Sequence, residues 1–316
     1  MFKKIKILIS LKNGKVKRLS KSIYEVGKNK IYFIGNDKEL NNYLIKYSKK
    51  EWVLNRVKKI NGLNLLLIQT NKWTLSDLIP TDKFFYSIEK ESNVIIHIPH
   101  KNIRIPEDFI SDYLIKDPLK ESIISSDIKV DYLIPNKIYE TNLMIFNYSR
   151  IFLDVERLPN DELEKEGRGK IYTSSSEGLL LRHLSKENRE KIEQIYDSYH
   201  EEFKDLILKK FNIYKRNTLI VDLHSFTDYK NTKIDICLGF NDKSSEKKAL
   251  KMKEVFEKHG FKVSLNYPYS NSIQPIEKID SVMIEVNKDL YFNKNGYFEN
   301  EDLISAIDQA IDLFVV

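Results

Sequence analysis

The sequence predicts an α/β fold with a mostly parallel or mixed central sheet that is covered by helices on both faces. Short apolar runs alternate with amphipathic helical patterns over most of the chain, which is typical of such a sheet. A length of 316 residues is enough for one large domain with a small appendage. The one cysteine, Cys237, excludes a disulfide scaffold and favours a reducing, cytoplasmic location.

The N-terminal part of the chain differs in charge from the rest. Residues 1–60 hold 17 of the 52 Lys and Arg residues but only four of the 46 Asp and Glu residues. The formal net charge of +6 therefore comes from this part, and the remainder is mildly acidic. A turn near Pro80 predicts a boundary between a small basic α+β region, 1–80, and a catalytic α/β domain, 81–316.

The elements of both parts follow from apolar periodicity. In the basic region, the pattern predicts strands at 5–11, 31–34 and 65–68 and a helix at 37–59. In the larger domain it predicts strands at 94–98, 151–155, 218–223, 235–238, 263–265 and 282–286. Apolar residues at three- and four-residue spacing predict helices at 185–211, 244–259 and 301–313. No apolar run approaches the roughly 20 residues of a membrane-spanning helix, so no membrane partner is expected.

Two interpretations of the basic region are open. Lys17-Arg18 and Lys58-Lys59, with aromatic residues such as Trp52 between them, are suited to contact phosphates and stack on bases. A solvated face covered by lysine has the same composition. The second interpretation is simpler, and we do not expect nucleic acid as a partner.

Several catalytic signatures are absent from the sequence. There is no phosphate-binding loop, no Gly-x-Gly-x-x-Gly, no Gly-x-Ser-x-Gly and no His-Glu-x-x-His. A cysteine-rich zinc site is excluded because the chain has a single cysteine. Nucleotide-dependent enzymes and serine hydrolases are therefore not expected.

Polar residues do follow several predicted strands, where ligands bind in open α/β sheets. His100 and His224 stand at two strand ends and are candidate metal ligands, although such a histidine can also be a hydrogen-bonded packing residue. Glu285 lies within an apolar strand, where a carboxylate must be paired, close to a metal ion or shifted in pKa. It is a candidate general base, and an inward-pointing charge at a sheet edge is the alternative.

Two further residues are candidates for substrate contacts. Arg157 has the planar geometry that pairs with a substrate carboxylate, but its charged loop also permits a surface salt bridge. His200 lies on the predicted helix 185–211 near Tyr196 and Phe203. It is therefore expected to face inward, either in the core or at the rim of the site.

Nine motifs in the range 83–316 together resemble the N-formylglutamate amidohydrolase family, part of a wider group with the zinc carboxypeptidases and aspartoacylase-like enzymes. The motifs are IPHKNIRIP (98–106), DIKVDYL (127–133), IFLDVERLPND (151–161), GRGKIYTSSSEG (167–178), YDSYH (196–200), VDLHSF (221–226), DICLGFN (235–241), VSLNYPYSNS (263–272) and VMIEVNKDLY (282–291). The resemblance implies a zinc-carboxypeptidase-like fold. It also implies hydrolysis of the formyl or other acyl amide of an N-acylated acidic amino acid or small peptide.

The resemblance also implies roles for single residues. His100 and His224 match the two metal histidines, for Zn²⁺ or another divalent transition metal, and Glu285 matches the general base. Arg157, in Asp-Val-Glu-Arg, matches an Asp-Val-Asn-Arg pattern whose arginine binds the substrate carboxylate. Further substrate contacts are expected from Arg182, His200 and Asn266.

The chain departs from the family pattern at three places. The glutamate expected three residues after His100 is replaced by Ile103, so we predict Asp127 as the third metal ligand, with Glu107 as the alternative. Lys101-Asn102 replaces Ser-Gly, and Asn271-Ser272 replaces paired glycines. A carboxypeptidase-like peptidase and a relative that has lost catalysis are therefore the alternative functions.

Overall fold

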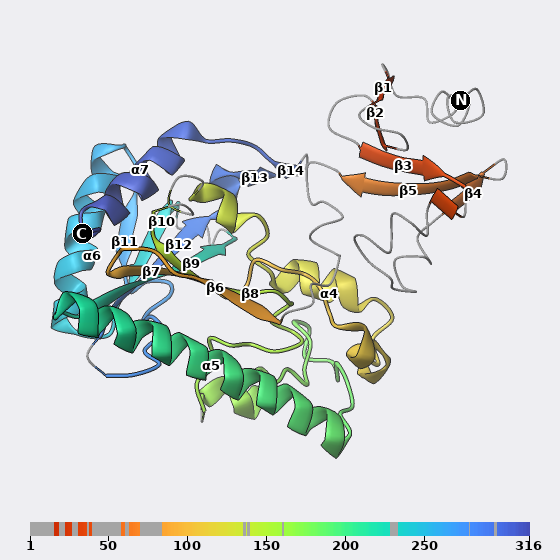
Figure 1. Ribbon diagram of the computed structural model, residues 1–316, viewed down its shortest axis with the longest axis horizontal. Helices are drawn as coiled ribbons and strands as arrows, with labels where there is room; N and C mark the ends of the chain where they lie inside the picture. The colour runs from red at the N-terminus through yellow and green to blue at the C-terminus, as the bar shows by residue number, and fades with distance from the viewer. Residues whose placement is uncertain are drawn as a thin grey trace. The chain divides into compact units, whose positions relative to one another are not determined.

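The computed structural model divides the chain into two compact units, which we describe separately. One comprises Met1–Pro80 and Phe292–Phe298, and the other Thr81–Tyr291 and Glu299–Val316 (Figure 1). The residues that the structure describes are 16–18, 23–26, 31–36, 38–39, 58–60, 63–69 and 84–316, the last range without 135–136, 138–139, 160, 228–232, 278 and 294–295.

The smaller unit contains an antiparallel five-stranded sheet in the order β1-β2-β3-β5-β4. Its strands are β1 (Val16–Arg18), β2 (Ile23–Val26), β3 (Ile31–Gly35), β4 (Lys58–Ile60) and β5 (Leu63–Gln69). The predicted strands at 31–34 and 65–68 are confirmed. The predicted strand 5–11 and most of the predicted helix 37–59 lie outside the described residues, but 58–59 belong to β4. Two short strands, β13 (Phe292–Asn293) and β14 (Gly296–Tyr297), pair with each other.

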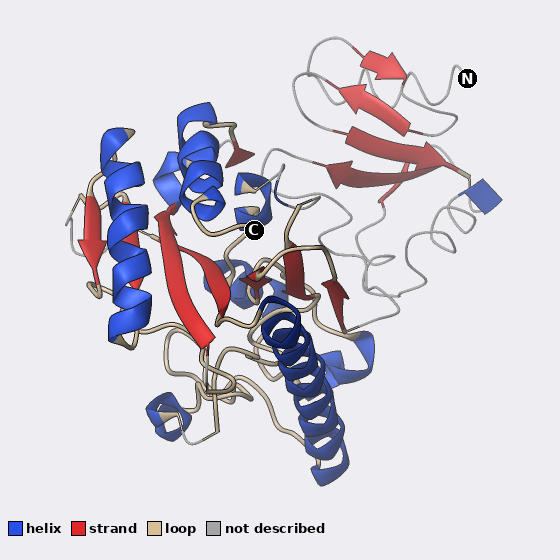
Figure 2. Ribbon diagram, turned by 60° about the vertical axis from the view of Figure 1, so that its left-hand side comes forward, coloured by secondary structure: helices blue, strands red, loops and turns tan. Residues whose placement is uncertain are grey.

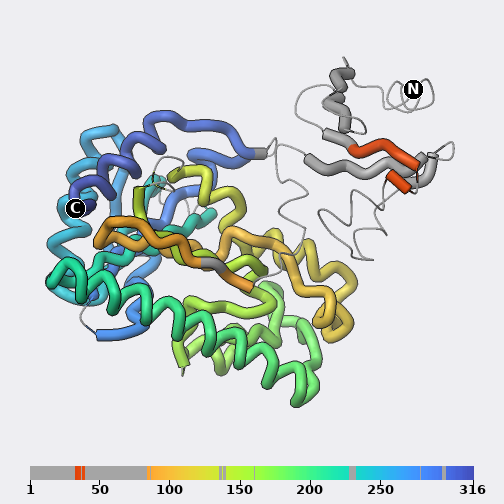
Figure 3. Tube along the Cα trace, in the orientation of Figure 1, coloured from red at the N-terminus to blue at the C-terminus, as the bar shows by residue number. Residues whose placement is uncertain are grey.

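The larger unit is built on a seven-stranded sheet in the order β11-β10-β12-β9-β7-β8-β6. Its strands are β6 (Phe85–Ile88), β7 (Val94–Ile98), β8 (Asn142–Phe146), β9 (Thr218–Phe226), β10 (Ile236–Gly239), β11 (Val263–Leu265) and β12 (Ile279–Asn287). The central strands β12, β9, β7 and β8 are parallel, whereas β6 and β10 run antiparallel to their inner neighbours. Strands far apart in the sequence therefore lie side by side (Figure 3), and the predicted mixed, mostly parallel α/β sheet is confirmed.

Helices cover this sheet on both faces. The α-helices of this unit are α4 (Pro118–Ser125), α5 (Lys186–Tyr214), α6 (Lys243–Lys258) and α7 (Glu301–Asp312). Helices α5 and α6 lie on opposite sides of the central strands (Figure 2), and the three predicted helices are confirmed. Tyr199 and Phe203 of α5 share one core with Ile95 and Ile220 of the sheet. Among the described residues, no helix is long and apolar enough to cross a membrane.

The predicted strand at 151–155 is wrong. These residues are buried, as a strand would be, but they form turns. The carbonyl of Ser149 accepts the backbone N–H groups of Phe152 and Leu153, and the Asp154 N–H reaches the carbonyl of Lys170. Because local partners satisfy these N–H groups, an apolar run can be buried without joining a sheet. Two strands of this sheet, β6 and β8, were not predicted from the sequence pattern, and β8 ends shortly before this run.

Asp242 begins α6 and carries a testable contribution to stability. Its Oδ1 accepts the N–H groups of Ser244 (2.8 Å) and Ser245 (2.9 Å), which have no partner within the helix. We expect Asp242→Ala to lower the free energy of unfolding by about 1 kcal/mol at pH 7, measured by urea denaturation.

This contribution should depend on pH. Burial raises the pKa of Asp242, but hydrogen bonds from Ser245 and Ser244 outweigh it and hold the pKa below its ordinary value. A depressed carboxyl pKa stabilises the fold above the ordinary pKa, and the stabilisation is lost as pH falls through the folded-state pKa. The difference between the wild type and Asp242→Ala should therefore narrow below pH 4. Asp242→Asn, which caps without titrating, should keep a constant difference from Asp242→Ala; a pH-independent gap between wild type and Asp242→Ala would contradict this.

Candidate metal centre

The centre lies at the carboxyl ends of the parallel strands β7, β9 and β12. His100 follows β7 by two residues, His224 lies within β9, and Glu285 lies within β12. Glu285 and His224 are direct neighbours in the parallel ladder between β12 and β9. Asp127 follows α4, and its backbone N–H donates to the carbonyl of His100 at 2.9 Å. This hydrogen bond places Asp127 beside His100, although 26 residues separate them in the sequence.

In each of the two histidines, Nε2 forms a hydrogen bond with a buried carboxylate. His100 Nε2 lies 2.7 Å from Asp154 Oδ1, and His224 Nε2 lies 2.9 Å from Asp222 Oδ1. A carboxylate accepts, so Nε2 carries the proton in both rings, and the neutral imidazole keeps a lone pair on Nδ1. Carboxylates commonly orient metal-binding histidines in this way.

The Nδ1 atoms of both rings converge with the Asp127 carboxylate. The Nδ1 atoms of His100 and His224 lie 3.3 Å from each other. Asp127 Oδ2 lies 3.1 Å from His224 Nδ1 and 3.7 Å from His100 Nδ1. Lone pairs this close repel one another unless a proton or a cation lies between them. Donor atoms bound to one tetrahedral ion at 2.0–2.1 Å are about 3.3 Å apart, so the residues fit a metal ion.

The electrostatics of the centre also favour positive charge. Burial lowers the pKa of His224, but the carboxylates of Glu156 and Asp222 outweigh it and hold this pKa well above its ordinary value. Burial raises the pKa of Asp127, but hydrogen bonds to His100 and His224 outweigh it and hold this pKa well below its ordinary value. A proton or a metal ion is therefore stabilised between these groups.

The carboxylates of Asp154 and Asp222, which orient the two histidines, accept further hydrogen bonds. Arg150 donates to Asp154 Oδ2 through Nε (3.1 Å) and Nη2 (2.8 Å), and the Tyr172 hydroxyl donates to the same oxygen. Asp222 Oδ1 also accepts Nδ1 of the fully buried His97 at 2.7 Å. His97 therefore helps to hold the carboxylate that orients His224.

Glu285 faces this centre from the neighbouring strand. It is 9% exposed, and its Oε2 is buried without a hydrogen-bond partner among the described residues. Burial, together with the charges of Asp127 and Glu156, outweighs the opposing charges of His224 and Arg150 and raises the pKa of Glu285 to about 8. A carboxylate with such a pKa and a free oxygen is suited to accept a proton.

The two predicted arginines occupy different environments. Arg157 is close to the centre: its Nε is buried without a hydrogen bond among the described residues and lies 3.7 Å from Asp154. Arg182 is 1% exposed and donates to the carbonyls of Tyr172 and Phe152 and to the Tyr113 hydroxyl. The structure therefore brings Arg157, but not Arg182, to the histidines.

Three other predicted residues lie apart from the converging atoms. The ring of His200 packs against that of Tyr196, tilted by 46° with centroids 4.3 Å apart. Burial lowers the pKa of His200 to about 4, so it is neutral at pH 7. The Asn266 side chain pairs with the backbone N–H and carbonyl of Phe240 at an exposed loop. Within the described part of the chain, Glu107 belongs to none of the groups whose ligand atoms converge, whereas Asp127 does.

Four residues of the centre were not predicted: Arg150, Asp154, Glu156 and Asp222. Alternate residues of a strand share a face, so the spacing of Asp222 and His224 was a usable signal. Nothing in the sequence connects Asp154 with His100, because they are 54 residues apart and meet only in the fold.

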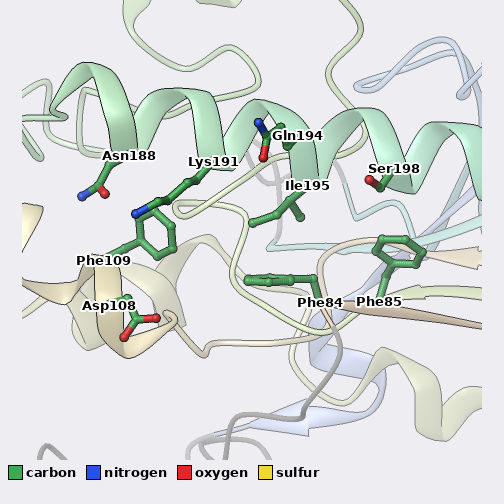
Figure 4. Close-up of a pocket in the computed structure, with 9 residues that line it drawn as sticks. All are labelled: Phe84, Phe85, Asp108, Phe109, Asn188, Lys191, Gln194, Ile195 and Ser198. Atoms are coloured by element: carbon green, nitrogen blue, oxygen red, sulfur yellow. The ribbon is translucent and has the colours of Figure 1, made fainter.

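A separate hollow of about 510 Å³ lies beside α5, between Phe84 and Phe85 on one side and Asp108 and Phe109 on the other (Figure 4). Its lining contains no histidine and only one carboxylate, from Asp108. It therefore lacks the converging acceptors of the metal centre, and we assign it no function.

Together these features define an α/β protein with a buried His-Asp-His cluster at the carboxyl edge of its sheet, and the converging ligand atoms of this cluster are suited to a metal ion. Residues 92–292, more than half of the chain, match the family described as N-formylglutamate amidohydrolase. The chain belongs to this family of hydrolases, as the sequence motifs predicted.

Solved structures support the same fold. The crystal structure of N-formylglutamate amidohydrolase from Ralstonia eutropha JMP134 is similar with a TM-score of 0.58 and 17% identity, over 73% of this chain and 95% of that chain. A gene product of Agrobacterium tumefaciens is similar with a TM-score of 0.55 and 20% identity, over 77% and 95%. No curated protein matches this chain by sequence.

Proposed function

We propose that the chain is a metal-dependent amidohydrolase that removes a formyl or other acyl group from an N-acylated acidic amino acid. The observation that carries this proposal is the convergence of His100 Nδ1, His224 Nδ1 and the Asp127 carboxylate within 3.7 Å. Family membership supports the hydrolytic class. Zn²⁺ is the ion we propose, because two imidazoles and one carboxylate with an open position are a common catalytic zinc set.

The residues of the centre have two roles in this reaction, metal binding and proton transfer. An ion held by the three ligands would supply Lewis-acid activation of a water molecule and of the scissile carbonyl. Glu285 accepts the proton of the attacking water at its free Oε2 and passes it to the leaving amine. Its raised pKa supports this role, because the carboxylate is more basic than that of an exposed glutamate.

Arg157 is the proposed contact to the acidic substrate. Its guanidinium lies 3.7 Å from both Asp154 and Asp161, too far for hydrogen bonds, so it retains donors for a substrate carboxylate. Lysine cannot reproduce the bidentate geometry of this contact, so Arg157→Lys would raise KM.

Metal removal tests the proposal. Purified protein is assayed with N-formylglutamate and N-acetylglutamate, and its metal content is measured on the same preparation. We expect about one transition ion per chain, loss of hydrolysis after dialysis against a chelator, and recovery with Zn²⁺ or Co²⁺. His224→Ala should not recover. Undiminished hydrolysis by metal-free protein would overturn the proposal.

A further inference from the structure

His97 is a fully buried histidine that has no part in the proposed reaction. It lies within β7, and its side chain has no exposed surface. Its ring stacks on that of Phe203 from α5, with centroids 5.0 Å and planes 19° apart. A hydrocarbon side chain would pack here without two ring nitrogens, which cost free energy in the core unless they are hydrogen-bonded. The partners of these nitrogens therefore indicate what the residue does.

Both ring nitrogens of His97 have a close partner. Nδ1 lies 2.7 Å from Asp222 Oδ1, and Nε2 lies 2.7 Å from the Tyr199 hydroxyl. A carboxylate accepts, so Nδ1 carries a proton and donates it. Burial holds the pKa of Tyr199 well above its ordinary value, so its hydroxyl keeps its proton and donates it to Nε2 of the neutral ring. Tyr199 thereby favours the form of His97 that donates to Asp222.

Asp222 connects His97 with His224. Its Oδ1, which accepts His97 Nδ1–H, also accepts His224 Nε2–H at 2.9 Å. His97 and Asp222 are paired in the ladder between β7 and β9, and His224 follows two residues later on β9. The three side chains therefore lie on the same face of the sheet. A continuous chain of hydrogen bonds runs from helix α5 to the ring of a candidate metal ligand.

The position of Asp222 Oδ1 determines which nitrogen of His224 faces the ion. His224 presents Nδ1 to the centre because its Nε2–H is directed at Asp222. The other oxygen of Asp222 accepts the Ile273 N–H at 3.2 Å and the Ser272 hydroxyl at 3.5 Å, which are longer contacts than either histidine makes with Oδ1. Without the His97 donor, His224 would be the remaining partner of Oδ1 among the described residues, and the carboxylate could turn about its Cβ–Cγ bond.

We propose that His97 is a positioning residue of the metal centre: its hydrogen bond to Asp222 holds the carboxylate that orients His224 and so raises the affinity of the centre for its ion. This inference rests on the metal site of the proposed function. Loss of an outer partner of a metal-binding histidine costs about 10–100-fold in affinity. His97 acts through such a partner, Asp222, so we expect its hydrogen bond to contribute about 10-fold.

Metal affinity tests the proposal without an activity assay. Asparagine and glutamine form a matched pair at position 97, because the side-chain N–H group of asparagine can lie where Nδ1 is and that of glutamine where Nε2 is. His97→Asn can therefore still donate to Asp222, whereas His97→Gln cannot. The full-length wild type and both variants are titrated with Co²⁺ against a chromophoric chelator. We expect His97→Gln to bind Co²⁺ about 10-fold more weakly and His97→Asn to bind it nearly as tightly as the wild type.

Phe203→Leu is the control for packing. It removes the ring that stacks on His97 but leaves the hydrogen bonds of His97 in place. It should therefore lower the free energy of unfolding, measured with urea, without weakening Co²⁺ binding.

Unchanged Co²⁺ affinity of His97→Gln would overturn the proposal. Equal losses in His97→Asn and His97→Gln, or a loss of the same size in Phe203→Leu, would also overturn it, because the effect would not depend on the hydrogen bond to Asp222. If the wild type itself binds no Co²⁺, the metal site of the proposed function fails together with this inference, whereas each of the other outcomes leaves that site intact.

Discussion

Replacing Glu285 by glutamine is expected to lower kcat for amide hydrolysis by about 10²–10⁴-fold, the usual contribution of a general base. Glutamine fills the same space but cannot accept the proton of water. Because Glu285 is not among the converging ligand atoms, the bound metal should stay at the wild-type level. Both quantities are measured on one preparation, kcat with N-formylglutamate and the metal by elemental analysis.

Two control variants test whether the loss of kcat in Glu285→Gln comes from loss of the base. Glu285→Asp keeps a carboxylate that is shorter by one methylene group and should retain part of the activity. Glu202→Gln should retain all of it, because Glu202 pairs with Ser87 away from the metal centre. A kcat of Glu285→Gln within threefold of the wild type would exclude Glu285 as the base.

Arg182→Met is expected to destabilise the protein by about 3–5 kcal/mol, with little change in KM. Arg182 donates to two backbone carbonyls, those of Tyr172 and Phe152, and to the hydroxyl of Tyr113. Methionine fills most of the volume but offers no donor, and each buried polar group left unpaired costs about 1–3 kcal/mol. Urea denaturation of the metal-free proteins measures the effect.

Arg157→Met is the matched comparison for this variant. Arg157 makes no close ion pair, so its loss should change stability by less than about 1 kcal/mol. It should instead raise KM for an acidic substrate. If Arg182→Met raised KM and left stability unchanged, the original expectation of a substrate contact would be restored.

Periodicity predicted the fold where an element's apolar pattern matched its geometry. The helices α5, α6 and α7 each present one apolar stripe, and their positions followed from the sequence. The strand predicted at 151–155 failed because burial and strand formation leave the same apolar signal. What distinguishes them is the local hydrogen bonding by Ser149 and Lys170, which only the fold reveals.

The centre was predictable only in part, for a similar reason. His100 and His224 follow from their places at strand ends, because parallel strands bring their carboxyl ends together. Asp127 was favoured over Glu107 without a spacing rule to support it. Glu156 gave no sign in the sequence that it lies at the centre, because an acidic residue in a charged loop is ordinarily solvated. Its proximity to both histidines, 3.6 Å from His100 Nδ1 and 3.5 Å from His224 Nε2, depends on how the loop after β8 folds back.

The pairing of Glu285 with His224 in the β12–β9 ladder has an evolutionary consequence. A one-residue slip between these strands would turn one of the two side chains to the opposite face of the sheet. The spacing of this pair therefore cannot drift gradually. His100 and Asp127 stand on connecting segments, where substitutions and changes of length move one group at a time. New coordination chemistry can arise on these segments while the sheet and the Glu285–His224 pair remain unchanged.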